Sequence, residues 1–176
     1  MKKLLCFVLI LCGGVLSSQA QKFGYIDSEY ILRHMPEYAE AQQQLDAMSE
    51  QWQKDIERRQ TEIEQLYKAY QSEQVLLTPE MRQKREEEIV AKEQELREFQ
   101  RGKFGFEGAL YQKRKELVKP VQDKIYKAVE EVDREGLYAV IFDRTSELIM
   151  LYADERFDKS DDVLEALGLN PGEFVE

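Results

Sequence analysis

Apolar and small side chains recur every three or four positions along the first of two long, charged stretches of this chain. The positions are Tyr38, Ala41, Leu45, Met48, Trp52, Ile56, Ile63, Leu66 and Tyr70. This spacing places them on one narrow face of a helix, close to a coiled-coil heptad with one four-residue insertion. Pro36 suits the first turn of such a helix. The pattern predicts a helix over residues 37–77, which would extend roughly 60 Å.

The segment "LLTPEM" carries the signals of a helix stop followed by a restart. Thr78 can cap a new helix, Pro79 suits its first position, and Glu80 lies near its positive end. We therefore predict a turn near residues 77–79.

A second helical stretch follows this turn. Its apolar positions are again three, four or seven residues apart: Ile89, Leu96, Phe99, Phe106, Leu110, Leu117, Val121, Ile125, Val129 and Val132. We expect the helix to end near Glu135, with Gly136 as a left-handed C-cap. Residues 36–135 are thus predicted to form an antiparallel helical hairpin, which we call the arm.

The two flanks, residues 21–35 and 136–176, carry the β-type patterns. "KFGYID" predicts a strand followed by a helical turn from Ser28, and "YAVIF" and "LIMLYA" predict two strands joined by "DRTSE". The last two runs are apolar at nearly every position, which is typical of strands buried on both faces. Near the end, Ser160 is expected to cap a short helix that Gly168 terminates.

The flanks are too short to build a large core of their own. We therefore expect a small β-rich body that is completed by oligomerisation. The predicted fold class is mainly α with a small β body (α+β), in which a long antiparallel helical-hairpin, coiled-coil arm projects from that body.

Residues 1–20 have the features of a cleavable secretory signal: a basic start, a short apolar stretch, and Ser18 and Ala20 before the expected cleavage point. The apolar stretch is too short for a permanent membrane span, and no later segment approaches the necessary length. A lipoprotein at Cys12 is the alternative, but Leu11 is larger than the side chain that such processing prefers. Since Cys6 and Cys12 are the only cysteines, the mature chain is expected to form no disulfide.

The net charge limits the classes of partner. The chain carries a formal charge of −10, and removal of Lys2 and Lys3 makes it more negative still. This balance argues against general affinity for nucleic acid or for an anionic membrane surface. We expect no nucleic-acid partner and no stable insertion into a membrane.

Catalytic and cofactor chemistry finds no support in the residue pattern. His34 is the only histidine, so neither a histidine metal cluster nor a Ser/His triad is available. The many carboxylates lie on thin charged helices, where they stay solvated. We predict a protein that is not an enzyme and that has no catalytic, cofactor-binding or metal-binding residues.

One basic cluster on the second helical stretch could bind phosphate or a lipid headgroup. It consists of Lys113, Arg114, Lys115 and Lys119. A solvated face whose cations pair with nearby Glu116 and Asp123 is the simpler interpretation.

Three glycines interrupt the second helical stretch at three-residue intervals: Gly102, Gly105 and Gly108. The spacing resembles a phosphate-binding loop, but such a loop follows a strand, and here the preceding residues are helical. Hairpin pairing places Trp52 opposite Phe104. We interpret the glycines as part of a continuous, thin helix, in which they form a notch that seats Trp52 and act as a hinge.

The order of motifs at the two ends resembles a known family. "FGYIDSEYILRHMPEYAEAQQQL", a charged hairpin, and then "LYAVIFDRTSELIMLYADERFDKSDDVLEALG" are similar to the Skp/OmpH family of periplasmic chaperones. The resemblance covers essentially the whole mature chain. It implies a homotrimer in the periplasm of a Gram-negative type of envelope, with a barrel-like body of strands from three subunits. Three helical arms would enclose a cavity that holds unfolded outer-membrane proteins without ATP before their insertion.

The acidic charge departs from well-known members of that family, which are basic. We therefore do not extend lipopolysaccharide binding from those basic members to this chain. A structural coiled-coil spacer or adaptor of the cell envelope, with no client, is the alternative function. An exported hydrolase would need a pocket and a catalytic set that the sequence does not show.

Six arm aromatics have two alternative roles. They pack between the helices or they contact clients, and they are Trp52, Tyr67, Tyr70, Phe99, Phe104 and Phe106.

Overall fold

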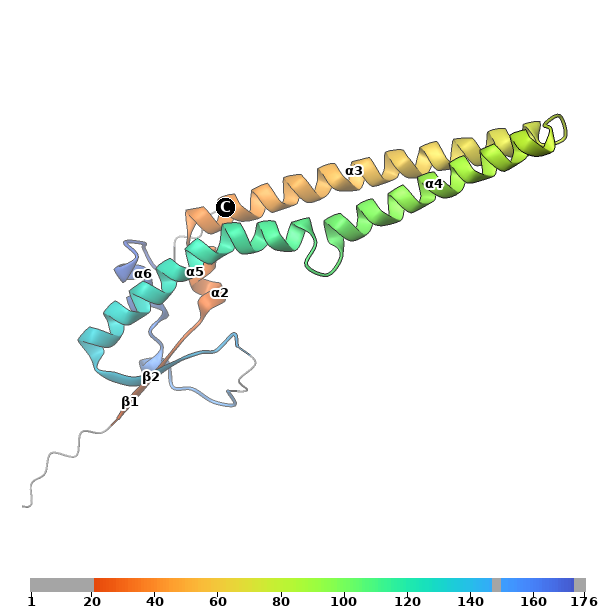
Figure 1. Ribbon diagram of the computed structural model, residues 1–176. Helices are drawn as coiled ribbons and strands as arrows, with labels where there is room; N and C mark the ends of the chain where they lie inside the picture. Colours follow the sequence, from red (N-terminus) through yellow and green to blue (C-terminus); the bar gives the residue numbers. More distant parts are fainter. Residues whose placement is uncertain (1–20, 147–149, 173–176) are drawn as a thin grey trace, which may run out of the picture.

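The computed structural model describes residues 21–146 and 150–172. A long helical arm projects from a small body near the chain ends (Figure 1). In chain order the elements are β1 (Lys22–Ile26), α2 (Ser28–Arg33), α3 (Pro36–Glu73), α4 (Pro79–Phe104), α5 (Ala109–Gly136), β2 (Tyr138–Asp143), the 3-10 helix η1 (Glu155–Phe157) and α6 (Ser160–Ala166).

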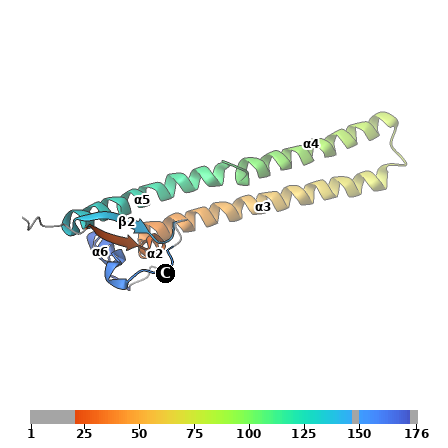
Figure 2. The same ribbon diagram turned by 90° about the horizontal axis from the view of Figure 1, so that it is seen from below.

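The arm is an antiparallel hairpin in which α3 runs beside α4 and then α5 (Figure 2). Its turn forms as the local signals predict: Thr78 precedes Pro79, and its side chain accepts a hydrogen bond from the Met81 amide at 3.3 Å. The first helix ends earlier than predicted, at Glu73, and residues 74–77 belong to the turn.

The prediction of a continuous second helix is wrong. α4 ends at Phe104 and α5 begins at Ala109, so residues 105–108 form an interruption that we call the helix break. Gly105 is extended, with ψ of 178°, and Glu107 has a positive φ of 54°. Glycine disfavours a helix interior, and here two glycines within four positions allow the chain to leave the helix and restart it.

The body contains a two-stranded parallel sheet, β1 with β2. Phe23 pairs with Val140 and Tyr25 with Phe142. Asp158 adds an isolated parallel bridge to Tyr25. Strands that are more than a hundred positions apart in sequence are therefore brought together by the arm, which begins with α3 shortly after β1 and ends with α5 just before β2.

The predicted strand "LIMLYA" falls partly on residues 147–149, which lie outside the described residues. Its described part, residues 150–153, forms no strand.

Three predicted helix ends were tested by the structure. Gly168 has a φ of 74° just after α6, as predicted. Gly136 is still helical, and Leu137 takes the left-handed C-cap position in its place, with a φ of 53°. Ser160 is the first residue of α6, after Lys159 as N-cap, and its hydroxyl donates to Asp158 at 2.6 Å. The prediction of Ser160 as the cap is therefore wrong.

The core lies where the last turns of α5 cross α2 and α6. Its buried members are Ile26, Ile31, Met35, Val121, Ile125, Ala128, Val132, Val163 and Leu164. The body therefore uses the end of the arm as well as both flanks, which fixes the direction in which the arm leaves it.

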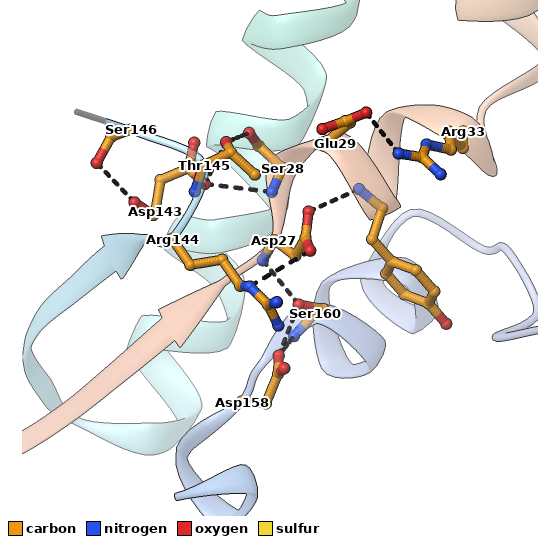
Figure 3. A network of polar contacts seen from close by, with 11 residues as sticks. Asp27, Ser28, Glu29, Arg33, Asp143, Arg144, Thr145, Ser146, Asp158 and Ser160 are labelled. Atoms are coloured by element: carbon orange, nitrogen blue, oxygen red, sulfur yellow. Dashed lines mark hydrogen bonds and ion pairs between the residues drawn. The ribbon is translucent and has the colours of Figure 1, made fainter. Parts of the chain in front are cut away.

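A polar network joins the sheet to α2, which precedes the arm (Figure 3). Asp27 caps α2 by accepting from the Tyr30 amide at 2.8 Å, and its own amide donates to the Ser160 hydroxyl at 2.9 Å. At the end of β2, one Asp143 oxygen accepts from the Ser28 amide at 3.3 Å and from the Thr145 hydroxyl at 2.8 Å. These bonds tie both strand ends to the first turn of α2.

Candidate functional site

The middle of the arm holds a cluster of rings and cations, which we call the mid-arm cluster: Trp52, Arg59, Phe99, Lys103 and Phe104. Trp52 meets Phe104 edge to face, with ring centres 5.9 Å apart, as the hairpin pairing predicts. The Lys103 ammonium lies 4.7 Å from the Trp52 ring centre and 5.5 Å from that of Phe99. The Arg59 guanidinium lies 4.7 Å from the Phe99 ring centre. The cluster fastens the last turns of α4 to α3 immediately before the helix break.

Sequence reasoning selected the rings but missed the two cations. A usable signal was present, because Phe99 and Lys103 are four positions apart and therefore share a helix face. A cation over an aromatic face is attracted by the ring quadrupole, most strongly over tryptophan.

Gly102 does not seat Trp52, contrary to this part of the predicted notch. A methyl group on Gly102 would meet nothing within 4 Å, and one on Gly108 would meet the carbonyl oxygens of Gly105 and Lys103 at 2.9 Å. One on Gly105 would collide with the carbonyl oxygen of Arg101. At Gly105 and Gly108 other backbone atoms therefore lie too close for a larger residue to fit without a shift.

Phe106 stands in the helix break and is 98% exposed. The structure does not bring it into the mid-arm cluster, although Phe104, two positions earlier, belongs to it. The positive φ of Glu107 turns the chain there, and the loop bows away from α3 (Figure 1).

Tyr67 and Tyr70 lie farther out and join the two helices by hydrogen bonds. The Tyr67 hydroxyl donates to Glu93 at 2.9 Å, and Tyr70 donates to Glu86. These bonds to carboxylates raise the pKa of both tyrosines. Their hydroxyl groups therefore fasten the hairpin, and only part of each ring faces solvent.

The basic cluster on α5 behaves in part as the simple interpretation predicts. Lys113 pairs with Glu116 at 2.8 Å and Lys119 pairs with Asp123 at 3.2 Å. Arg114 and Lys115 form no ion pair within the described chain.

The body carries an apolar groove of about 600 Å³ beside the sheet, lined among others by Phe23, Phe142, Tyr152 and Phe157. Tyr152 is 84% exposed. Rings of this size on a small sheet are typical of an interaction surface.

His34 has a structural environment. Its Nδ1 lies 2.8 Å from the Tyr30 carbonyl oxygen, and its Nε2 accepts from the Gly172 amide at 3.3 Å. Among residues 21–146 and 150–172, no group of three or more potential ligand side chains is placed to hold a metal ion. No helix in that part of the chain has the length and apolar character of a membrane span.

Comparison with known protein families identifies the family of this chain. The model of the family described as "Outer membrane protein (OmpH-like)" matches residues 22–167, most of the chain. The chain belongs to the OmpH-like family. The resemblance read from the sequence motifs is thereby confirmed.

Two individual proteins are similar to this chain. An uncharacterized protein of Aquifex aeolicus (strain VF5) is 31% identical to this OmpH-like chain over 167 residues, which cover 95% of this chain and 96% of that protein. A crystal structure of a candidate outer membrane chaperone (OmpH-like) from Caulobacter crescentus CB15 superposes with a TM-score of 0.68 at 15% identity, covering 88% of each chain. At that identity the second likeness supports the fold, a helical arm on a small body.

Proposed function

We propose that this OmpH-like protein is an ATP-independent holdase chaperone of the periplasm. It binds unfolded outer-membrane proteins in a cavity between helical arms and keeps them from aggregating before membrane insertion. The observation that carries this proposal is the uncovered arm: of the 38 residues of α3, only Ala41, Leu45, Ile56 and Ile63 are buried. A long helix with so little of its surface packed suits many weak contacts with another chain.

A homotrimer completes the body in this proposal. The apolar groove beside the sheet and the exposed rings of Phe23, Tyr152 and Phe157 support an interface with further copies. Three arms from one such body would enclose a space that a single arm does not provide.

The structural spacer is the alternative function, and the packing of α4 argues against it. Of its 26 residues, only Ile89 is buried. A spacer needs a tightly packed interface between its helices to hold a fixed length. An arm that bends around clients of different sizes functions with few buried residues between its helices. The same reasoning assigns hinge motion to the helix break, and client contact to its exposed ring, Phe106.

The decisive experiment is an aggregation assay. An outer-membrane β-barrel protein is diluted from urea with and without residues 21–176, and light scattering is recorded. We expect suppression at one trimer per client without added ATP. Native mass measurement of the same sample should show three chains.

A result without suppression at that ratio would reject the holdase and favour the spacer. A stable monomer would reject the trimer, since the groove would then stay uncovered in solution.

A further inference from the structure

Basic side chains that lack carboxylate partners within the described residues flank the helix break. Farther out on the arm, Arg58 and Arg85 are paired, with Glu62 at 2.9 Å and Glu88 at 3.1 Å. Within the described chain, Arg101, Arg114 and Lys115 form neither an ion pair nor a hydrogen bond through their side chains. Their charge is therefore available to an anion from outside.

Exposed rings accompany these cations. Phe106 is 98% exposed and Tyr111 is 51% exposed. Tyr111 shares a face of α5 with Arg114 and Lys115, which follow it by three and four positions. Phe106 makes no ring contact within the described chain. Phe106 and Tyr111 therefore lie within nine positions of the unpaired Arg114 and Lys115 along the chain.

The local charge contrasts with that of the whole chain. The formal net charge is −10, yet residues 101–115 hold Glu107 as their only carboxylate. The basic residues in the same segment are Arg101, Lys103, Lys113, Arg114 and Lys115. A negatively charged segment is therefore repelled by most of the protein and attracted here.

The helix break also has a defined shape. The Gly105 amide donates to the Arg101 carbonyl at 2.9 Å, and the Gly108 amide donates to the Gly105 carbonyl at 2.9 Å. Phe106 thus stands in a hydrogen-bonded turn, within the loop between α4 and α5 that bows away from α3 (Figure 1). Its ring does not have to leave other contacts before it can receive a partner.

We propose that the helix break binds an unfolded polypeptide segment in which an aromatic side chain lies beside carboxylates. The rings of Phe106 and Tyr111 pack against the aromatic side chain, and Arg114 and Lys115 pair with the carboxylates. This inference rests on the proposed holdase function and names the class of client segment that one site of the arm selects. The contact of Lys103 with Trp52 joins the end of α4 to α3 just before the break.

The test uses three labelled, unstructured peptides that lack tryptophan. The parent contains phenylalanine flanked by Asp and Glu, the second has Asn and Gln in their place, and the third has alanine for phenylalanine. Binding to residues 21–176 is measured by anisotropy, and by the fluorescence of Trp52, the only tryptophan. We expect the parent to bind roughly tenfold more tightly than either altered peptide at low salt, because one altered peptide lacks the carboxylates and the other lacks the aromatic ring.

Matched variants locate the site. Arg114→Glu with Lys115→Glu should weaken parent binding by about tenfold or more, whereas Lys127→Glu with Arg134→Glu makes the same change of charge elsewhere on α5 and should not. Phe106→Ala should weaken binding by about tenfold, whereas Tyr126→Ala, at an exposed ring far from the break, should not. Circular dichroism confirms that each variant is folded.

Several results would overturn the proposal. These are equal binding of the three peptides, equal losses in the control variants, or binding to phosphatidylglycerol vesicles with none to the parent peptide. The aggregation assay separates this site from the wider function. If the wild type suppresses aggregation while the break variants bind the parent normally, the site is wrong and the holdase stands. If the wild type binds the parent through the break but suppresses nothing, the holdase fails and the site stands.

Discussion

The ammonium group of Lys103 on α4 lies 4.7 Å from the centre of the Trp52 ring on α3. This contact joins α4 to α3 one residue before α4 ends at Phe104. Because Trp52 is the only tryptophan in the chain, its fluorescence reports directly on the contact.

Replacing Lys103 by glutamine removes the cation from both the Trp52 and the Phe99 ring. We expect the free energy of unfolding to fall by about 0.5–2 kcal/mol, the range for such contacts. The Trp52 emission should change as well. Lys115→Gln removes an unpaired lysine from α5 and should change neither quantity. Unaltered emission in Lys103→Gln would contradict the contact.

Gly102 and Gly105 give a pair of substitutions with opposite expected signs. Gly102 lies inside α4 with open space around it, so alanine should stabilise the protein by about 1 kcal/mol through helix propensity. At Gly105 the added methyl group would collide with the Arg101 carbonyl oxygen, and alanine should destabilise the observed turn by about 1–3 kcal/mol.

Urea unfolding at one fixed protein concentration measures both glycine variants, since oligomerisation would otherwise shift the midpoints. Equal stabilisation by the two alanines would mean that the arm is continuously helical in solution.

Asp143 should make stability depend on acid pH. Partial burial alone would raise its pKa, but the hydrogen bonds from Ser28 and Thr145 outweigh burial and hold the pKa below its ordinary value. The ionised form is therefore favoured in the folded state. Its contribution is complete above the unfolded pKa of about 3.9 and disappears as the pH falls through the lower folded value.

The Asp143→Asn variant separates this group from the rest of the chain. It should lose about 1 kcal/mol near pH 7, and the difference from the wild type should vanish in acid. Asp46 is exposed, and its side chain has no hydrogen bond or ion pair within the described chain, so Asp46→Asn should match the wild type throughout. Urea midpoints between pH 7 and about pH 2 provide the measurement, since the loss occurs below the unfolded pKa. A difference independent of pH would exclude the carboxylate as its cause.

Local signals predicted the arm because each acts within one helical turn. Thr78 and Pro79 specify a helix start by capping and backbone geometry alone. The fold class and the family resemblance followed from the hairpin and its flanks, and both are confirmed.

The features that sequence reasoning missed depend on distant or competing contacts. Continuous helix was predicted through Gly105 because the apolar spacing resumes after it, and the spacing does not reveal whether the turn or the helix has lower free energy. The parallel pairing of β1 with β2 joins the two ends of the chain, and no local pattern encodes that register. The Lys103 contact was missed because one of its rings, Trp52, lies on the other helix, and only the fold brings the two together.

The helix break should set where the arm bends, because glycine gives the backbone a freedom that alanine removes. Spin labels at Glu87 on α4 and Gln122 on α5, both exposed, report the distance across the break. Residues 21–176 contain no cysteine, so engineered cysteines label only these sites. Labelled chains are diluted with unlabelled ones to isolate a single arm.

Alanine at Gly102, Gly105 and Gly108 together should raise helicity and narrow the distance distribution. Gly102→Ala alone is the matched control, because it raises helix propensity beside the break without altering the turn. If the triple variant gains helicity but keeps the wild-type width, the arm bends elsewhere. The bend would then lie along α4, where only Ile89 is buried. A hairpin with so few buried residues between its helices can bend along its length as well as at a break.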